Sequence, residues 1–190
     1  MHSINGMLTA HTISIPPVQR RYRVVTDEDS SCRLVASKPS VPGSVSLRVS
    51  RFPTSPEALD ACLDLLIADF DHDFSTALGA FEICYRSWSD GRPGVRPRSR
   101  AARQHAERVG NDLFQLIRGY ATAYLTMTSL ARERGLTLKS HAVPLWLQSG
   151  IADVQSGASS WLSLEELTNQ RLHFAGKVLQ TIEPRTADGR

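Results

Sequence analysis

The chain has 190 residues, of which 41% are hydrophobic and 22% are charged, and its formal net charge is +3. This composition is ordinary for a globular protein and excludes wholesale disorder, and so small a charge implies no partner by itself. The N-terminal sequence has no basic leader followed by an apolar run, and no apolar run approaches the ~20 residues that span a bilayer. We therefore expect a cytoplasmic protein with no membrane partner, and three reduced thiols, at Cys32, Cys62 and Cys84.

Residues 1–55 are predicted to form a small antiparallel β element of two to four strands. Prolines punctuate four runs that are rich in β-branched residues, at 12–15, 21–25, 32–36 and 44–49. In the last run, Val45, Leu47 and Val49 alternate with polar residues in the period-2 pattern of a half-buried strand. An element this short buries little surface alone, so it should lie against the helical part.

From residue 56 the pattern of apolar residues becomes helical. Pro56 suits the first position of a helix, and Glu57 and Asp60 favour the positive end of its dipole. Apolar residues then recur at three- and four-residue steps and stay in phase for about eight turns. The stripe predicts one helix over 56–89, and its members are Leu59, Leu63, Leu66, Phe70, Phe74, Ala77, Phe81, Cys84 and Trp88.

A second apolar stripe predicts a partner helix of similar length. Residues 90–97 contain two prolines and two glycines and must form a loop. The stripe then runs from Ala102 to Ala131 and ends at Gly135, a residue typical of the position after a helix. Two long helices joined by a short loop pack antiparallel, so residues 56–134 are predicted to form a helical hairpin.

The remaining chain predicts shorter helices at about 143–155 and 163–181, followed by a frayed tail over 184–190. The expected fold class is α+β and predominantly α. It comprises the N-terminal β element (1–55) on a helical domain (56–183), which contains the long antiparallel hairpin and the two shorter C-terminal helices. The parts should form one compact unit.

The most basic segment is the predicted tip of this hairpin. Seven arginines lie between Arg86 and Arg108 against two acids, so 7 − 2 gives a local charge of +5. The candidate binding residues are Trp88, Arg92, Arg96, Arg98, Arg100 and Arg103. Arginines beside an aromatic residue can contact phosphates and stack on a base, or can grip an acidic protein surface. A solvated helix start is the alternative without a function.

The start of the first long helix is acidic, with six Asp and Glu and no Lys or Arg over 57–73. In an antiparallel hairpin, Arg118, Arg132 and Arg134 would lie beside these acids. Within this stretch Asp69 and Asp73 share a face that borders the core, while His72 lies on its outer side. These three are weak candidates for a metal site, because carboxylate and imidazole groups bind divalent cations. A solvated acidic face is the favoured interpretation.

No nucleophile elbow, phosphate loop or dinucleotide motif occurs in the sequence. The sequence therefore favours a non-catalytic adaptor, regulator or accessory factor without a cofactor. Its Arg-rich tip would contact an acidic partner, either protein or nucleic acid. Two alternatives remain open. One is a metal-assisted hydrolase that uses Asp69 and Asp73, and the other is a structural subunit of an oligomer or larger complex.

Overall fold

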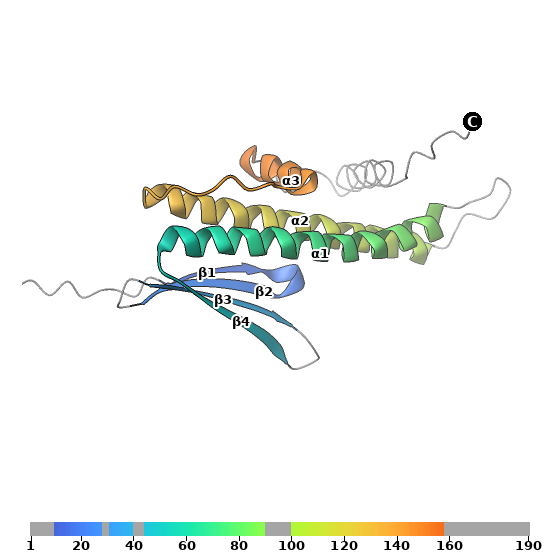
Figure 1. Cartoon of the computed structure of the whole chain (residues 1–190). Helices are drawn as coiled ribbons and strands as arrows, with labels where there is room; N and C mark the ends of the chain where they lie inside the picture. The colour runs from blue at the N-terminus through green and yellow to red at the C-terminus, as the bar shows by residue number, and fades with distance from the viewer. Residues whose placement is uncertain (1–9, 28–30, 40–43, 90–99, 158–190) are drawn as a thin grey trace, which may run out of the picture. The chain divides into compact units, whose positions relative to one another are not determined.

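The computed structural model describes residues 10–27, 31–39, 44–89 and 100–157. It is a mostly helical α+β protein in which a four-stranded antiparallel N-terminal sheet packs against three helices (Figure 1). This arrangement confirms that the fold is α+β and mostly helical, with an antiparallel N-terminal sheet packed on helices. The chain divides into two compact units. The first contains the sheet, α1 up to Asp73, α2 from Leu116 and the short helix α3, and the second contains the remaining parts of α1 and α2.

The sheet is built from β1 (Ala10–Ile15), β2 (Arg20–Thr26), β3 (Cys32–Pro39) and β4 (Val45–Phe52). The strands pair antiparallel in sequence order, so β1 and β4 are the two edges. A 3-10 turn over Pro16–Val18 joins β1 to β2, and Gln19 closes it with a left-handed φ of 52°. All four predicted strands are therefore present, each longer than its sequence pattern indicated.

The two long helices are α1 (Ser55–Ser89) and α2 (Arg100–Glu133), and they match the two predicted stripes. Gly135 follows α2 with φ 65°, and its N–H donates to the carbonyl of Arg132. This is the left-handed ending that a glycine permits without strain. The short helix α3 (Leu145–Gln155) confirms the helix expected at about 143–155.

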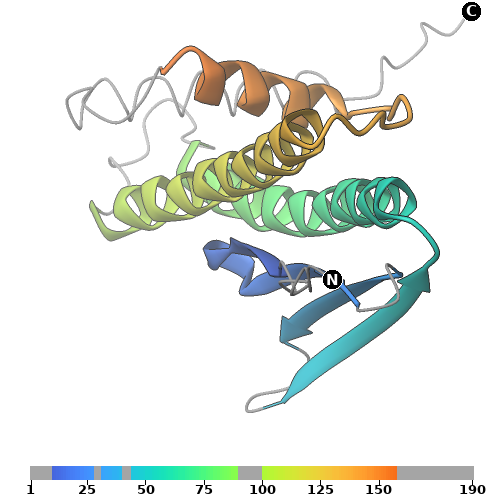
Figure 2. The same ribbon diagram turned by 90° about the vertical axis from the view of Figure 1, so that its left-hand side faces the viewer.

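In the first unit, the sheet and α3 lie on opposite sides of α1 and α2 (Figures 1 and 2). The Tyr120 ring meets the Phe70 ring edge-on, with centroids 5.4 Å apart. On the sheet side, a Cβ added at Gly119 would lie 3.1 Å from Ile15, and on the other side a Cβ at Gly150 would lie 2.6 Å from Ile117. Glycines thus allow α2 to approach both neighbours closely.

The core of this unit lies between the sheet and the helices. One face of the sheet contributes Ile15, Tyr22, Cys32 and Leu34, all of which are buried. The predicted stripes of the helices contribute their buried members in this unit: Leu59, Leu63, Leu66, Phe70, Leu116, Ile117, Tyr120, Met127 and Ala131. The helical periodicity therefore identified the core-facing sides of α1 and α2 correctly.

The second unit has a smaller described core, in which Phe74, Leu78, Phe81 and Leu113 are buried. A Cβ added at Gly110 would lie 3.0 Å from the Phe81 ring, so α1 and α2 also pack closely here. The predicted loop, the helix expected over 163–181 and the tail lie outside the described residues. Among the helices that are described, none is long and apolar enough to cross a membrane.

Candidate functional site

A buried ion-pair cluster joins β2 to α1 in the first unit. Arg20 is the second residue after the 3-10 turn, and its side chain is only 7% exposed. Its Nε and Nη2 donate to the two carboxylate oxygens of Asp73 at 2.6 and 2.7 Å, and its Nη1 lies 3.0 Å from Asp69 Oδ1. A guanidinium offers donors in a planar fork, so one arginine can hold two carboxylates at once.

Two tyrosines complete this cluster. Tyr22 donates its hydroxyl to Asp69 at 2.7 Å, and Tyr120 of α2 donates to Asp73 at 2.6 Å. Burial raises the pKa of both phenols, and their contacts with the carboxylates raise it further, so both hydroxyls keep their protons. The cluster therefore connects the sheet, α1 and α2 through charge-assisted hydrogen bonds.

The electrostatics of Asp73 follow from these contacts. Burial alone would raise the pKa of the Asp73 carboxyl, but hydrogen bonds from Arg20 and Tyr120 outweigh burial and hold it below its ordinary value. The bond to Asp73 in turn raises the pKa of Arg20 against the opposing effect of burial. Both groups are therefore charged at neutral pH.

The prediction that Asp69 and Asp73 share a face bordering the core is confirmed, and His72 is exposed. The partner of these acids is Arg20, however. Within the described part of the chain, Arg118, Arg132 and Arg134 form no ion pair with the acids of α1. No group of three His, Cys, Asp or Glu among the described residues is arranged to hold a metal ion. A cation at Asp69 and Asp73 would have to displace their bonds to Arg20, so metal binding there stays a prediction.

A second polar cluster of this unit, around Asp60, holds the segment that follows α2 against α1. Asp60 accepts the backbone N–H of Lys139 at 3.0 Å. The buried Nε2 of His141 lies 3.6 Å from Asp60 and 3.5 Å from Asp64, with no hydrogen bond to either. The two contacts agree with an antiparallel arrangement of α1 and α2, because Asp73 in the middle of α1 meets Tyr120 in α2, whereas Asp60 near the start of α1 meets the chain beyond Glu133.

The outer face of the sheet has an unexpected composition. The strand register places Ser46, Arg48 and Ser50 of β4 on the side of the buried residues Ala36 and Leu34. Val45, Leu47 and Val49 consequently point outward and are 63, 67 and 57% exposed. The alternating pattern of this strand is confirmed, but its apolar side is turned to solvent and not to the core.

Arginines share the outer face of the sheet with these three aliphatic side chains. Leu47 of β4 pairs with Ser37 of β3, which in turn pairs with Arg21 of β2. In the same way, Val49 pairs with Val35, and Val35 pairs with Arg23. Arg33 and Arg51 form the next row, and Arg33 is bonded to Asp27 at 2.6 Å. Arg21, Arg23 and Arg51 form no ion pair with any residue that the structure describes. We call Val45, Leu47 and Val49 with these three arginines the outer patch.

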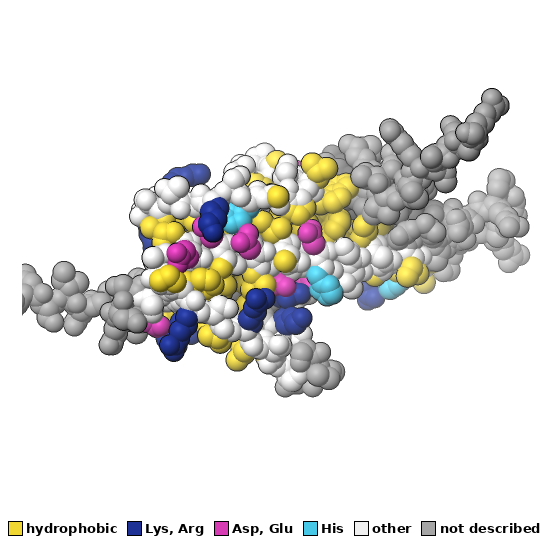
Figure 3. Space-filling view, in the orientation of Figure 1, with side chains coloured by type: hydrophobic (Ala, Val, Ile, Leu, Met, Phe, Trp, Pro, Cys, Tyr) yellow, Lys and Arg dark blue, Asp and Glu magenta, His cyan; other side chains and the backbone are white. Residues whose placement is uncertain are grey.

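In the space-filling view, several basic side chains lie over the sheet, while others lie over the helices among the acidic side chains (Figure 3). The outer patch combines the exposed aliphatic side chains of β4 with basic side chains on the same face of the sheet. Such a surface suits a partner that is both apolar and acidic.

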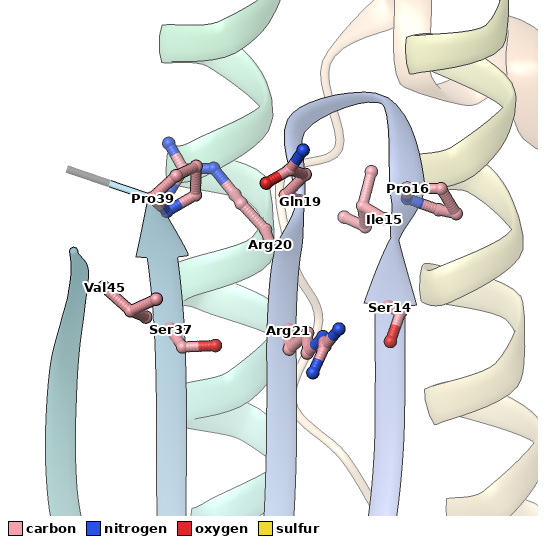
Figure 4. Close-up of a pocket in the computed structure, with 9 residues that line it drawn as sticks. All are labelled: Ser14, Ile15, Pro16, Gln19, Arg20, Arg21, Ser37, Pro39 and Val45. Carbon is pink, nitrogen blue, oxygen red and sulfur yellow. The ribbon is translucent and has the colours of Figure 1, made fainter. Parts of the chain in front are cut away.

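Two open cavities adjoin the sheet. The larger, of about 490 Å³, lies at the end where β1 turns into β2, and Ser14, Gln19, Arg21 and Val45 are among its lining residues (Figure 4). The smaller, of about 180 Å³, lies between the sheet and α1 and is lined by Arg20, Lys38, Arg48 and Asp69, among others. Both cavities bring cationic side chains next to the first half of β4.

The structure describes only part of the predicted Arg-rich tip. Arg100 is the first residue of α2 and is exposed. Trp88 belongs to α1 and Arg103 to α2, but their side chains lie outside the described part, as do residues Arg92, Arg96 and Arg98 altogether. The Arg-rich tip therefore stays a prediction.

Sequence reasoning missed both Arg20 and the outer patch. Arg20 lies two residues before Tyr22 in a strand, and this period-2 spacing was the available signal that it faces the core. Its partners Asp69 and Asp73 lie 49 and 53 residues away in sequence. Comparison with known proteins adds no further guide, because no protein-family model, curated protein or solved structure matches the chain.

Proposed function

We propose that this chain is a non-catalytic, cytoplasmic binding protein that contacts an acidic protein through the outer patch. The observation that carries the proposal is the exposure of Val45, Leu47 and Val49 on a sheet face whose arginines (Arg21, Arg23 and Arg51) form no ion pair with a described residue. Fully burying one such side chain contributes about 1.5–3 kcal/mol, so covering three that are roughly 60% exposed would contribute about 3–5 kcal/mol. A partner that covers this patch therefore gains substantial affinity.

The composition of the outer patch favours a protein over a nucleic acid. Proteins that bind single-stranded nucleic acids stack bases on aromatic side chains, and the outward positions of the four strands carry no aromatic residue. Aliphatic side chains flanked by arginine instead resemble the core and rim of a protein interface, where apolar contacts supply affinity and charges select the partner.

The Arg-rich hairpin tip fits the same proposal as a second contact for an acidic partner. Its local charge of +5 and the exposed Arg100 at the start of α2 support this role. A tip contact and a sheet contact make different predictions, because they depend on different residues. They can therefore be tested side by side.

Affinity capture from cell extract with three forms of the protein tests the proposal. The forms are the wild type, a sheet variant carrying Leu47→Ser and Val49→Ser, and a tip variant carrying Arg96→Ala, Arg98→Ala and Arg100→Ala. We expect the wild type to capture acidic proteins, the sheet variant to lose them, and nuclease treatment to leave the capture unchanged. Equal capture by the wild type and the sheet variant would refute the role of the outer patch, and loss after nuclease treatment would indicate a nucleic-acid partner.

A further inference from the structure

Strand β4 is an edge of the described sheet. It pairs with β3 on one side only, so along its other side half of its N–H and C=O groups have no strand partner among the described residues. Proteins usually protect such an edge by a proline, a very short strand, charged side chains or a covering element. β4 has eight residues from Val45 to Phe52 and contains no proline, and its charged residues are Arg48 and Arg51.

No described element covers the first part of β4. Every residue from Val45 to Val49 is exposed, which includes the inward-pointing Ser46 and Arg48. Figure 2 shows the reason, because β3 and β4 extend away from α1 toward the end where they are joined. Both faces of this edge are thus accessible, and so is its backbone.

The side chains beside this edge specify what could pair with it. On the outer side, a neighbouring strand would place alternate residues against Val45, Leu47 and Val49. On the inner side, its other residues would lie next to Arg48, with Lys38 on β3 nearby. An added strand should therefore alternate apolar residues with acidic ones.

The same charges disfavour a second copy of β4 as the occupant. Antiparallel self-pairing would bring two copies of Arg48 and two of Arg51 to one junction with no acidic residue in either strand, and like charges that come directly opposite each other are destabilising. An acidic segment has the opposite effect, since it neutralises these arginines.

We infer that β4 accepts an extended segment of its partner as a fifth strand, with alternating apolar and acidic side chains. This inference rests on the proposed function, because it uses the same outer patch, and it adds the mode of recognition. Main-chain hydrogen bonds along the edge supply affinity in this mode, and the alternating side chains supply specificity.

Synthetic peptides test this inference directly. The probe is a fluorescent seven-residue peptide that alternates valine with glutamate, and a peptide of the same composition with its valines and glutamates in separate blocks is the control. We expect the alternating peptide to bind at least about tenfold more tightly by fluorescence anisotropy, since only alternation matches the period of a strand. Equal affinity for the two orders, or no binding of the alternating peptide, would overturn the inference.

Backbone pairing has a signature of its own. Two further probes carry N-methyl groups on alternate amides. One probe is methylated at the odd-numbered residues of the peptide and the other at the even-numbered residues. Only one set of amides faces the protein in a strand pair, so we expect one probe to lose binding and the other to retain it. Hydrogen exchange should likewise slow at alternate amides of β4. If both N-methylated probes bind like the parent, the peptide lies on the outer patch without joining the sheet; strand addition is then wrong while the proposed function stands.

Charge-reversed protein variants complete the test. Arg48→Glu is an exposed change that should weaken binding of the glutamate peptide about tenfold or more and favour a peptide with lysine in its place. Arg132→Glu alters the net charge equally, lies exposed in the last turn of α2 away from the predicted tip, and should leave binding unchanged. An equal effect of both variants would show nonspecific attraction and overturn the inference. A dimer seen by sedimentation and abolished by Leu47→Glu would identify a second copy as the occupant and overturn it as well.

Discussion

Replacing Asp73 by alanine should lower the stability of the protein sharply. The change removes two hydrogen bonds from the buried Arg20 and one from Tyr120, all 2.6–2.7 Å long. Breaking a buried ion pair by removing one partner costs about 3–5 kcal/mol, because the remaining charge is left uncompensated. Asp69 still faces Arg20 at 3.0 Å, so we expect the lower end of this range, about 3 kcal/mol.

Urea unfolding followed by circular dichroism measures this loss. The matched control is Asp71→Ala, which removes an exposed acid two positions away on the same helix and should change the free energy of unfolding by less than about 0.5 kcal/mol. A loss of about 3 kcal/mol corresponds to a melting temperature lower by about 6–12 °C for a chain of this size. Equal stabilities of the two variants would refute the idea that this cluster holds the sheet to the helices.

The same carboxylate predicts how stability depends on pH. Because the pKa of Asp73 is lower in the folded protein than its ordinary value of 3.8, its ionised form stabilises the fold. This contribution is fully present at a pH above the ordinary pKa and is lost as the pH falls through the lower pKa that Asp73 has in the folded protein. The difference in stability between the wild type and Asp73→Asn should therefore be constant from about pH 5 to 8 and shrink in stronger acid. A difference that grows in acid would contradict the assignment of the charged form.

Three further predictions concern packing. Gly150→Ala should destabilise the protein by about 1–3 kcal/mol, because its Cβ would lie 2.6 Å from Ile117, and Ile117→Ala should relieve part of that cost. Gly79→Ala, in α1 with no neighbour within 4 Å, should instead stabilise by about 0.5–1 kcal/mol, and chemical unfolding of both variants checks the opposite signs. Burial raises the pKa of Cys62 to about 12, so in the folded protein its thiol should be alkylated at pH 8 far more slowly than that of Cys84. Mass spectrometry measures the two rates before and after unfolding, and equal rates in the folded protein would contradict the burial of Cys62.

The sequence predicted most elements of the fold because their patterns are local. The stripe that begins at Leu59 keeps one phase along α1, so one continuous helix was the simplest interpretation. Gly135 marked the end of α2 by a backbone conformation that other residues adopt at a cost. Each of these signals lies within a few residues of the feature that it predicts.

The orientation of β4 could not be predicted in the same way. Alternation fixes which residues share a face, but not which face meets the core. Toward its start, β4 extends away from α1, so the core does not select its apolar side there (Figure 2). The burial of Arg20 escaped prediction for a related reason. Its partners Asp69 and Asp73 belong to another element, and no local pattern shows that the two elements meet.

The ion-pair cluster also limits how this protein can be divided. Arg20 comes from the N-terminal strands, whereas the two carboxylates it neutralises come from α1. A fragment that starts at residue 56 would retain both acids without their cation, so like charges one turn apart would repel each other, and it would expose the apolar side chains that the sheet covers. The helices alone are therefore a poor choice for expression, and truncations intended to isolate a minimal folded part should retain the chain from β1 onward.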